Sequence, residues 1–219
     1  MDSLILTFNK QQLDLYKELS KKENIELDFD TSMPKIDEFN MPSLDTPLSA
    51  MENEAKALLK HNVRASSFSA PFSQEEIKAL TPVYYNALLQ IKRQLSLITS
   101  DTYKLSSKIG EINRALANIN KRYADFLPYK AALYNKEGYY TEINLIDTRF
   151  KENIKALDAL KAELLAVFEK CEKITNIVSD FMQASSKASD EPKFKSFDSR
   201  KFFLSVEAFI EQIKAIKSN

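Results

Sequence analysis

Side chains with strong chemical reactivity are few in this chain. The 219 residues include one histidine, His61, and one cysteine, Cys171. A single histidine cannot supply the paired Glu-x-x-His motifs of di-metal helical bundles, and zinc sites of the Cys/His type fail for the same reason. We expect His61 to lie at the end of a helix, where the helix dipole favours a cation. We expect Cys171 to be a small buried hydrophobic side chain.

The glycine content also argues against an enzyme. Only Gly110 and Gly138 are present, so neither a phosphate-binding glycine loop nor a nucleophile elbow can be formed. Carboxylates of the predicted helices lie mostly three to four residues from lysines, which is the pattern of a solvated helix face. The sequence therefore predicts no catalytic, cofactor-binding or metal-binding residues.

Tyrosines are concentrated in one short region. Five of the nine fall between residues 123 and 140, and tyrosine is enriched at protein-binding surfaces. In one interpretation, four of them point outward and bind a partner or a membrane interface: Tyr129, Tyr134, Tyr139 and Tyr140. In the other, these rings pack on one another to close a turn.

A second candidate is an acidic segment. From Glu23 to Asp45 there are seven acids and one base, Lys35. Its apolar anchors are Phe29, Met33, Ile36 and Phe39. Such a stretch can fold onto another protein, or it can lie on the protein's own helices. Apolar and acidic residues alternate from Ile25 to Asp30, which suits an extended chain lying along a helical groove.

The elements that position these residues follow from apolar spacing. Apolar residues recur about every 3.5 residues from Ile77 to Phe126 and again from Ile143 to Phe181, which is the heptad spacing of a left-handed coiled coil. The cap-like residues 99–102 suggest a break, but the register continues across them. A short connection makes consecutive helices antiparallel neighbours. The sequence predicts a long helical hairpin over 81–184 with a tip at 127–138.

The complete prediction is an all-α fold, forming a single elongated helical domain over 1–219. It is an antiparallel, coiled-coil-like helical hairpin with shorter N- and C-terminal helices packed at its open end, so that the tip projects. The other predicted elements are an N-terminal helix (1–24), an acidic extended segment (25–44), short helices (45–80), a linker (185–197) and a C-terminal helix (198–219).

Charge and hydropathy restrict the partners. Lys plus Arg and Asp plus Glu number 31 each, so no global basic field attracts nucleic acid. The sequence contains neither a signal-peptide pattern nor an apolar run of membrane-spanning length. We expect a cytoplasmic protein, with non-classical export as an alternative.

These observations favour a non-enzymatic structural or adaptor subunit that uses the hairpin to bind protein partners in a larger assembly. A homo-oligomer is compatible with it if the hairpin keeps a second apolar face. The alternative is a membrane-acting helical protein, either a pore-forming toxin component or a membrane-curving rod. The polar tip connection and the absence of a lysine-rich face argue against that alternative.

Overall fold

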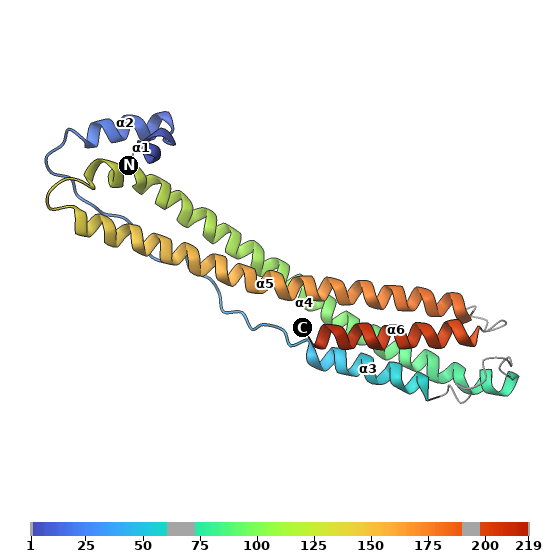
Figure 1. Ribbon diagram of the computed structural model, residues 1–219. Helices are drawn as coiled ribbons and strands as arrows, with labels where there is room; N and C mark the ends of the chain where they lie inside the picture. Colours follow the sequence, from blue (N-terminus) through green and yellow to red (C-terminus); the bar gives the residue numbers. More distant parts are fainter. Residues whose placement is uncertain (1, 61–72, 190–197, 219) are drawn as a thin grey trace. The chain divides into compact units, whose positions relative to one another are not determined.

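A computed structural model describes residues 2–60, 73–189 and 198–218, and all the regular elements in these ranges are α helices (Figure 1). The helices are α1 (Asp2–Leu6), α2 (Lys10–Leu19), α3 (Asp45–Leu59), α4 (Gln74–Leu133), α5 (Tyr140–Ser189) and α6 (Ser199–Lys217). The predicted all-α fold is confirmed. His61 lies outside the described residues.

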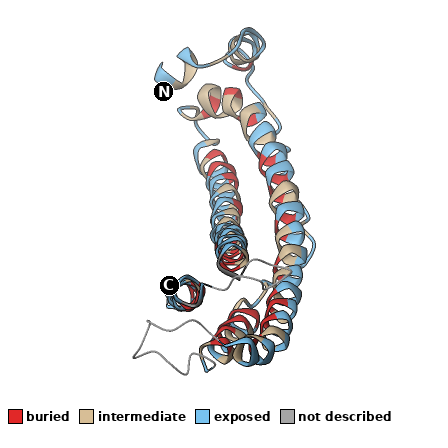
Figure 2. Ribbon diagram, turned by 90° about the vertical axis from the view of Figure 1, so that its right-hand side faces the viewer, coloured by how far each residue is buried: buried red, intermediate tan, exposed pale blue. Residues whose placement is uncertain are grey.

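Helices α4 and α5 form the predicted antiparallel hairpin. The Tyr84 and Ser185 hydroxyls lie 3.4 Å apart, and the Tyr123 hydroxyl donates to Asp147 at 2.8 Å. Residue numbers therefore rise along α4 while those of the facing residues on α5 fall, which is the antiparallel arrangement. Heptad positions are buried on both helices, as Figure 2 shows in red. On α4 they are Tyr84, Ile91, Ile98, Leu105, Ile112, Ile119, Phe126 and Leu133; on α5 they are Ile143, Phe150, Leu157, Leu164, Cys171 and Val178.

Helix α4 begins at Gln74, earlier than the predicted start at 81. A capping box is present at its start, since Ser73 N donates to Glu76 Oε2 at 2.7 Å and Glu76 N donates to Ser73 Oγ at 3.2 Å. It opens the long helix itself instead of a separate short one. Thr81 does not act as a cap, because its hydroxyl donates to Ile77 O at 2.7 Å inside the helix.

The cap-like cluster at residues 99–102 does not interrupt α4. Thr99 Oγ1 donates to Leu95 O at 2.9 Å, and Thr102 Oγ1 donates to Ile98 O at 2.8 Å. Hydroxyls that donate to the carbonyl four residues earlier are compatible with a helix interior. The continuous register was therefore the correct guide.

The connection between the two long helices is shorter than predicted. Helix α4 continues past Pro128 to Leu133, and the loop covers only residues 134–139. Gly138 adopts φ 89° in this loop, a conformation that is strained for residues with a Cβ. Both ribbon views show the last turns of α4 bending away from the rest of the helix (Figures 1 and 2), as expected for a proline within a helix.

The chain divides into two compact units, which are described separately. Unit 1 contains residues 2–39 and 107–165, and unit 2 contains residues 40–106 and 166–218. In unit 2, α3 and α6 pack together beside the open-end portions of α4 and α5. The Phe181 and Phe209 rings stack with centroids 4.4 Å apart. Asp198 caps α6, accepting from Lys201 N at 3.0 Å.

The N-terminal helix lies elsewhere than predicted. Residues 1–24 hold two helices, and α2 packs in unit 1 against the closed end of the hairpin. Gln12 Nε2 donates to Ala124 O at 2.9 Å, and Lys136 Nζ donates to Leu19 O at 3.3 Å. The prediction of an open-end position failed because the extended segment separates α2 from α3, so sequence proximity does not imply spatial proximity. Helix α2 therefore covers part of the closed end.

One other boundary differs from the predictions, and one agrees with them. Helix α5 continues through Ser189, so the first part of the predicted 185–197 linker is helical, and residues 190–197 lie outside the described ranges. Helix α3 begins at Asp45 with Leu44 in the N-cap position and without a side-chain cap.

Candidate interaction surface at the closed end of the hairpin

Residues 20–39, which we call the strap, extend along the hairpin in unit 1. Their backbone is non-helical beyond the turn at residues 20–21. From residue 25 the exposure alternates, with odd-numbered residues partly buried and even-numbered residues exposed as far as residue 32. This is the period of an extended chain with one face packed. The predicted extended conformation along a helical groove is confirmed.

Side chains of α4 and α5 satisfy the polar backbone of the strap. Arg122 Nη1 donates to Asp30 O at 2.9 Å and Oδ2 at 2.6 Å, and its Nη2 donates to Ser32 O at 3.1 Å. Asn153 Nδ2 donates to Thr31 O at 2.7 Å. An extended segment without a partner strand needs such donors for its carbonyls. These contacts hold the middle of the strap to both helices.

A second attachment lies near residue 37. Lys108 is 6% exposed, and its ammonium donates to Asp37 O and, at 2.8 Å, to Glu111 Oε2. Asp37 N donates to Glu111 Oε1 at 2.9 Å. The hydrogen bonds from Lys108 and then from Asp37 N–H lower the pKa of Glu111. A buried lysine is thus satisfied by a carboxylate of its own helix and a carbonyl of the strap.

The two groups of residues predicted as sites meet in the structure. The Phe29 ring of the strap lies edge-on to Tyr129, with centroids 4.9 Å apart, and to Phe126, at 5.1 Å. Ile25 N donates to the Tyr139 hydroxyl at 2.9 Å. Tyr129 and Tyr139 therefore bind the strap of their own chain.

The other two predicted tyrosines contact each other. Tyr134 and Tyr140 form an edge-to-face pair with centroids 5.1 Å apart, and Tyr140 is 55% exposed. Among the strap anchors, Ile36 and Phe39 are partly buried, whereas Met33 is exposed. The structure thus shows an intramolecular packing role for part of each predicted set, and binding of another protein stays a prediction.

A buried ionic cluster inside the hairpin was missed in the sequence. Asp147 Oδ1 accepts from Tyr123 Oη and Lys130 Nζ, both at 2.8 Å, and its Oδ2 accepts from Lys151 Nζ at 2.7 Å. Burial alone would raise the pKa of Asp147, but hydrogen bonds from Lys130, Lys151 and Tyr123 lower it. Burial, and then the bond to Asp147, raises the pKa of Tyr123. The available signal was an acid directly beside the seam residue Ile146.

A second missed residue is Gln12. Pro128 has no N–H, so Ala124 O loses its helical donor, and Gln12 Nε2 replaces that donor at 2.9 Å. Gln12 Oε1 accepts from Asn9 N at 3.1 Å, completing a capping box at the start of α2. One amide therefore both caps α2 and attaches it to α4.

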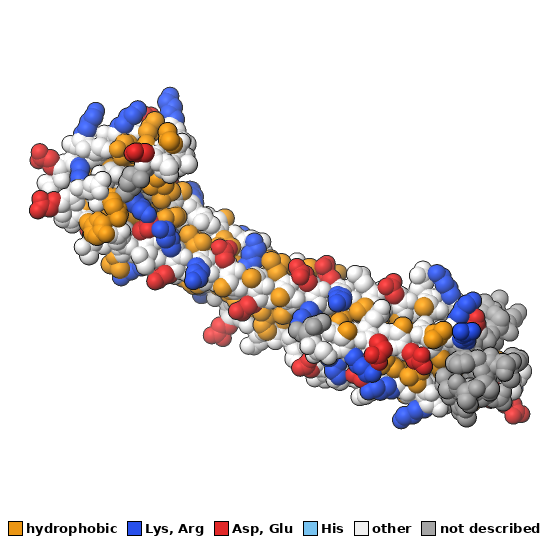
Figure 3. Space-filling model, viewed as in Figure 1, with side chains coloured by type: hydrophobic (Ala, Val, Ile, Leu, Met, Phe, Trp, Pro, Cys, Tyr) orange, Lys and Arg blue, Asp and Glu red, His pale blue; other side chains and the backbone are white. Residues whose placement is uncertain are grey.

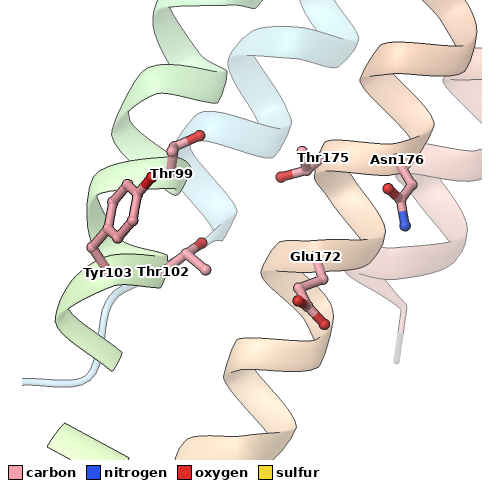
Figure 4. Close-up of a pocket in the computed structure, with 6 residues that line it drawn as sticks. All are labelled: Thr99, Thr102, Tyr103, Glu172, Thr175 and Asn176. Atoms are coloured by element: carbon pink, nitrogen blue, oxygen red, sulfur yellow. The ribbon is translucent and has the colours of Figure 1, made fainter. Parts of the chain in front are cut away.

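Unit 2 carries a groove of about 380 Å³ between α4 and α5 (Figure 4). Its lining residues are Thr99, Thr102, Tyr103, Glu172, Thr175 and Asn176. Cys171 is buried beneath this region as a free thiol, and burial raises its pKa. The prediction of a small buried side chain is confirmed. Tyr103 is 75% exposed at the groove edge.

The comparisons with known proteins yield no relative, because no family model, no curated protein and no solved structure matches the chain. Within the described ranges, no group of three or more His, Cys, Asp or Glu side chains is arranged to hold a metal ion. None of the helices described is both long and apolar enough to cross a membrane.

Proposed function

We propose that this protein is a non-enzymatic structural or adaptor subunit, which binds other proteins through faces of its helical hairpin. The proposal is supported by two continuous helices of 60 and 50 residues. Their seams are buried by the chain itself, and large apolar side chains remain exposed on other parts of both helices. As part of the same proposal we place the protein in the cytoplasm, since its one cysteine is a buried free thiol suited to a reducing compartment.

The observation that carries the proposal is a face of α4 in unit 2. Tyr85, Leu89 and Tyr103 are 39%, 48% and 75% exposed. Leu89 follows Tyr85 by four residues and Tyr103 follows it by eighteen. Both spacings are close to whole numbers of helical turns, so the three side chains share one face of α4. Exposed aromatic and aliphatic side chains on one helix face can serve as anchors for a protein partner, and tyrosine is a frequent hot-spot residue.

A second face lies at the closed end in unit 1. Here the exposed ring of Tyr140 is supported by Tyr134. A rigid aromatic pair offers contact area with little conformational entropy to lose on binding. In this proposal Tyr134 and Tyr140 meet the partner, while Tyr129 and Tyr139 keep the strap in place beside them. Figure 3 shows hydrophobic side chains scattered among both signs of charge, the mixed character of many transient interfaces.

The test is affinity purification of the tagged full chain from its native lysate, with quantitative identification of the proteins that co-purify. We compare the parent protein with Tyr103→Ser, Tyr140→Ser and the control Asn113→Ser, which changes an exposed polar residue of α4. The proposal expects partners that are depleted at least severalfold by one tyrosine variant and retained by the control. Recovery of nothing beyond the tag-only sample, or identical recovery with all variants, would reject it.

A further inference from the structure

Unit 1 contains a groove of about 650 Å³ between the strap and α4. One wall is formed by strap residues, including Lys35, and the other by α4 residues, including Arg114, Asn118 and Arg122. The α4 residues are spaced by four, so they lie in one row along the helix. Lys35 belongs to the opposite wall.

The charge of the groove is unbalanced in favour of cations. Its two acids already have partners, because Asp30 pairs with Arg122 at 2.6 Å and Glu111 pairs with Lys108 at 2.8 Å. Lys35 and Arg114 form no ion pair or hydrogen bond within the described part of the chain. These two exposed cations therefore give the groove an excess of positive charge, although Arg114 also helps to lower the pKa of Glu111.

The hydrogen-bonding groups of the groove match the charge. Arg114 and Lys35 are donors only, and the Asn118 amide adds two more N–H groups. The Nε of Arg122 is removed from water and has no hydrogen-bond partner, although buried charged donors are normally paired. Both walls of the groove therefore carry hydrogen-bond donors, and the buried Arg122 Nε is a donor without an acceptor.

We propose that this groove binds a phosphate group. A phosphate oxyanion accepts hydrogen bonds from several directions, whereas a carboxylate accepts in a single plane, and the donors here lie on two walls. Arginine is well suited to phosphate because its planar fork offers two parallel N–H groups. Arg114 supplies the fork, Asn118 and Lys35 complete the contacts, and the paired Arg122 adds positive potential. This inference is independent of the proposed adaptor function.

The first experiment titrates the full-length protein with inorganic phosphate and with pyrophosphate at constant ionic strength, following backbone amide shifts by NMR. We expect saturable shifts in residues around Lys35 and Arg114. Arg114→Gln and Lys35→Gln should each weaken binding by about tenfold, the effect of losing one charged hydrogen bond. Both side chains are exposed, so the fold should not change. The control Arg149→Gln removes an exposed arginine of α5 outside the groove.

A second arm distinguishes the source of the phosphate. Flotation is measured with phosphatidylcholine vesicles that contain or lack phosphatidic acid. Arg114-dependent flotation would identify a lipid headgroup, and saturable binding of soluble phosphate without flotation would identify a free phosphate compound; either result supports the site. Shifts that do not saturate, or that are equal in the parent and Arg114→Gln proteins, would overturn the proposal.

Discussion

The attachment of α2 to α4 gives a prediction that depends on a single hydrogen bond. In Gln12→Glu, a carboxylate oxygen takes the place of the amide nitrogen that lies 2.9 Å from Ala124 O. The capping box survives, because glutamate accepts from Asn9 N as glutamine does. Only the donor to the Ala124 carbonyl is lost, and two acceptors then face each other.

The expected cost follows from that geometry. Losing one neutral hydrogen bond and leaving a partly buried carbonyl without a donor costs about 1–2 kcal/mol. This corresponds to roughly a 5–30-fold increase in the opening of α2. Hydrogen exchange of the α2 amides measures this opening directly. Gln11→Glu is the matched control, because it adds the same charge at an exposed neighbouring position.

The cause can be isolated by repeating the substitution with Pro128→Ala. Alanine restores an N–H at position 128, which donates to Ala124 O along the helix, so Gln12→Glu should then cost less than about 0.5 kcal/mol. Lowering the pH to about one unit below the ordinary glutamate pKa of about 4.3 should protonate the introduced carboxylate, and its O–H can then donate to the Ala124 carbonyl. The reasoning is refuted if protection of α2 is unchanged, or if the loss is the same with Pro128→Ala.

Three further predictions concern other contacts. Arg122→Ala removes the donors to the strap, and trypsin should cleave after Lys35 roughly tenfold faster in timed digests; an unchanged rate would show that Arg122 does not hold the strap. Asp147→Asn keeps the shape but removes the charge that pairs with two lysines, and should lower the free energy of unfolding in urea by about 2–3 kcal/mol. Glu52, buried on α3, accepts from Lys56 and Lys217, and these bonds lower its pKa to about 2. The stability that ionised Glu52 adds to the fold is therefore present above the unfolded-state pKa and is lost as the pH falls from about 4.5 towards 2. We expect a loss of about 1–2 kcal/mol, because both lysines are partly exposed and solvent screens their charge. Glu52→Gln should flatten the acid side of the stability curve, and an identical curve would refute it.

The hairpin was predictable because its signal is repeated many times. Seven-residue spacing recurs from Tyr84 to Leu133 and from Ile143 to Val178, and each buried residue supports the same register. One local contradiction, such as the hydroxyls of residues 99–102, cannot outweigh that periodicity. The strap was predictable in part, since a two-residue alternation without a partner strand leaves few environments other than a helical groove.

The sequence-based predictions failed where a single contact between residues far apart in the chain determines the local structure. By local propensity, Pro128 indicates the end of a helix. In the structure it lies inside α4, because Gln12 Nε2 donates to the Ala124 carbonyl that the proline leaves without a helical donor. The position of α2 depends on such contacts, and no periodicity reports them. The Asp147 cluster was missed because a charge beside an apolar seam reads as solvated until its three donors are identified. The tyrosines were found by composition, yet composition did not show which of them contact the strap.

The ribosome makes the strap before it makes the helices to which the strap binds. Its partners Arg122 and Asn153 follow it by 92 and 122 residues, so the acidic N-terminal stretch leaves the ribosome long before its binding groove exists. Closing contacts of such long separation is slow, because the intervening chain must first be ordered. The hairpin must therefore assemble before the strap attaches, and the newly made strap spends that interval available to chaperones or other chains.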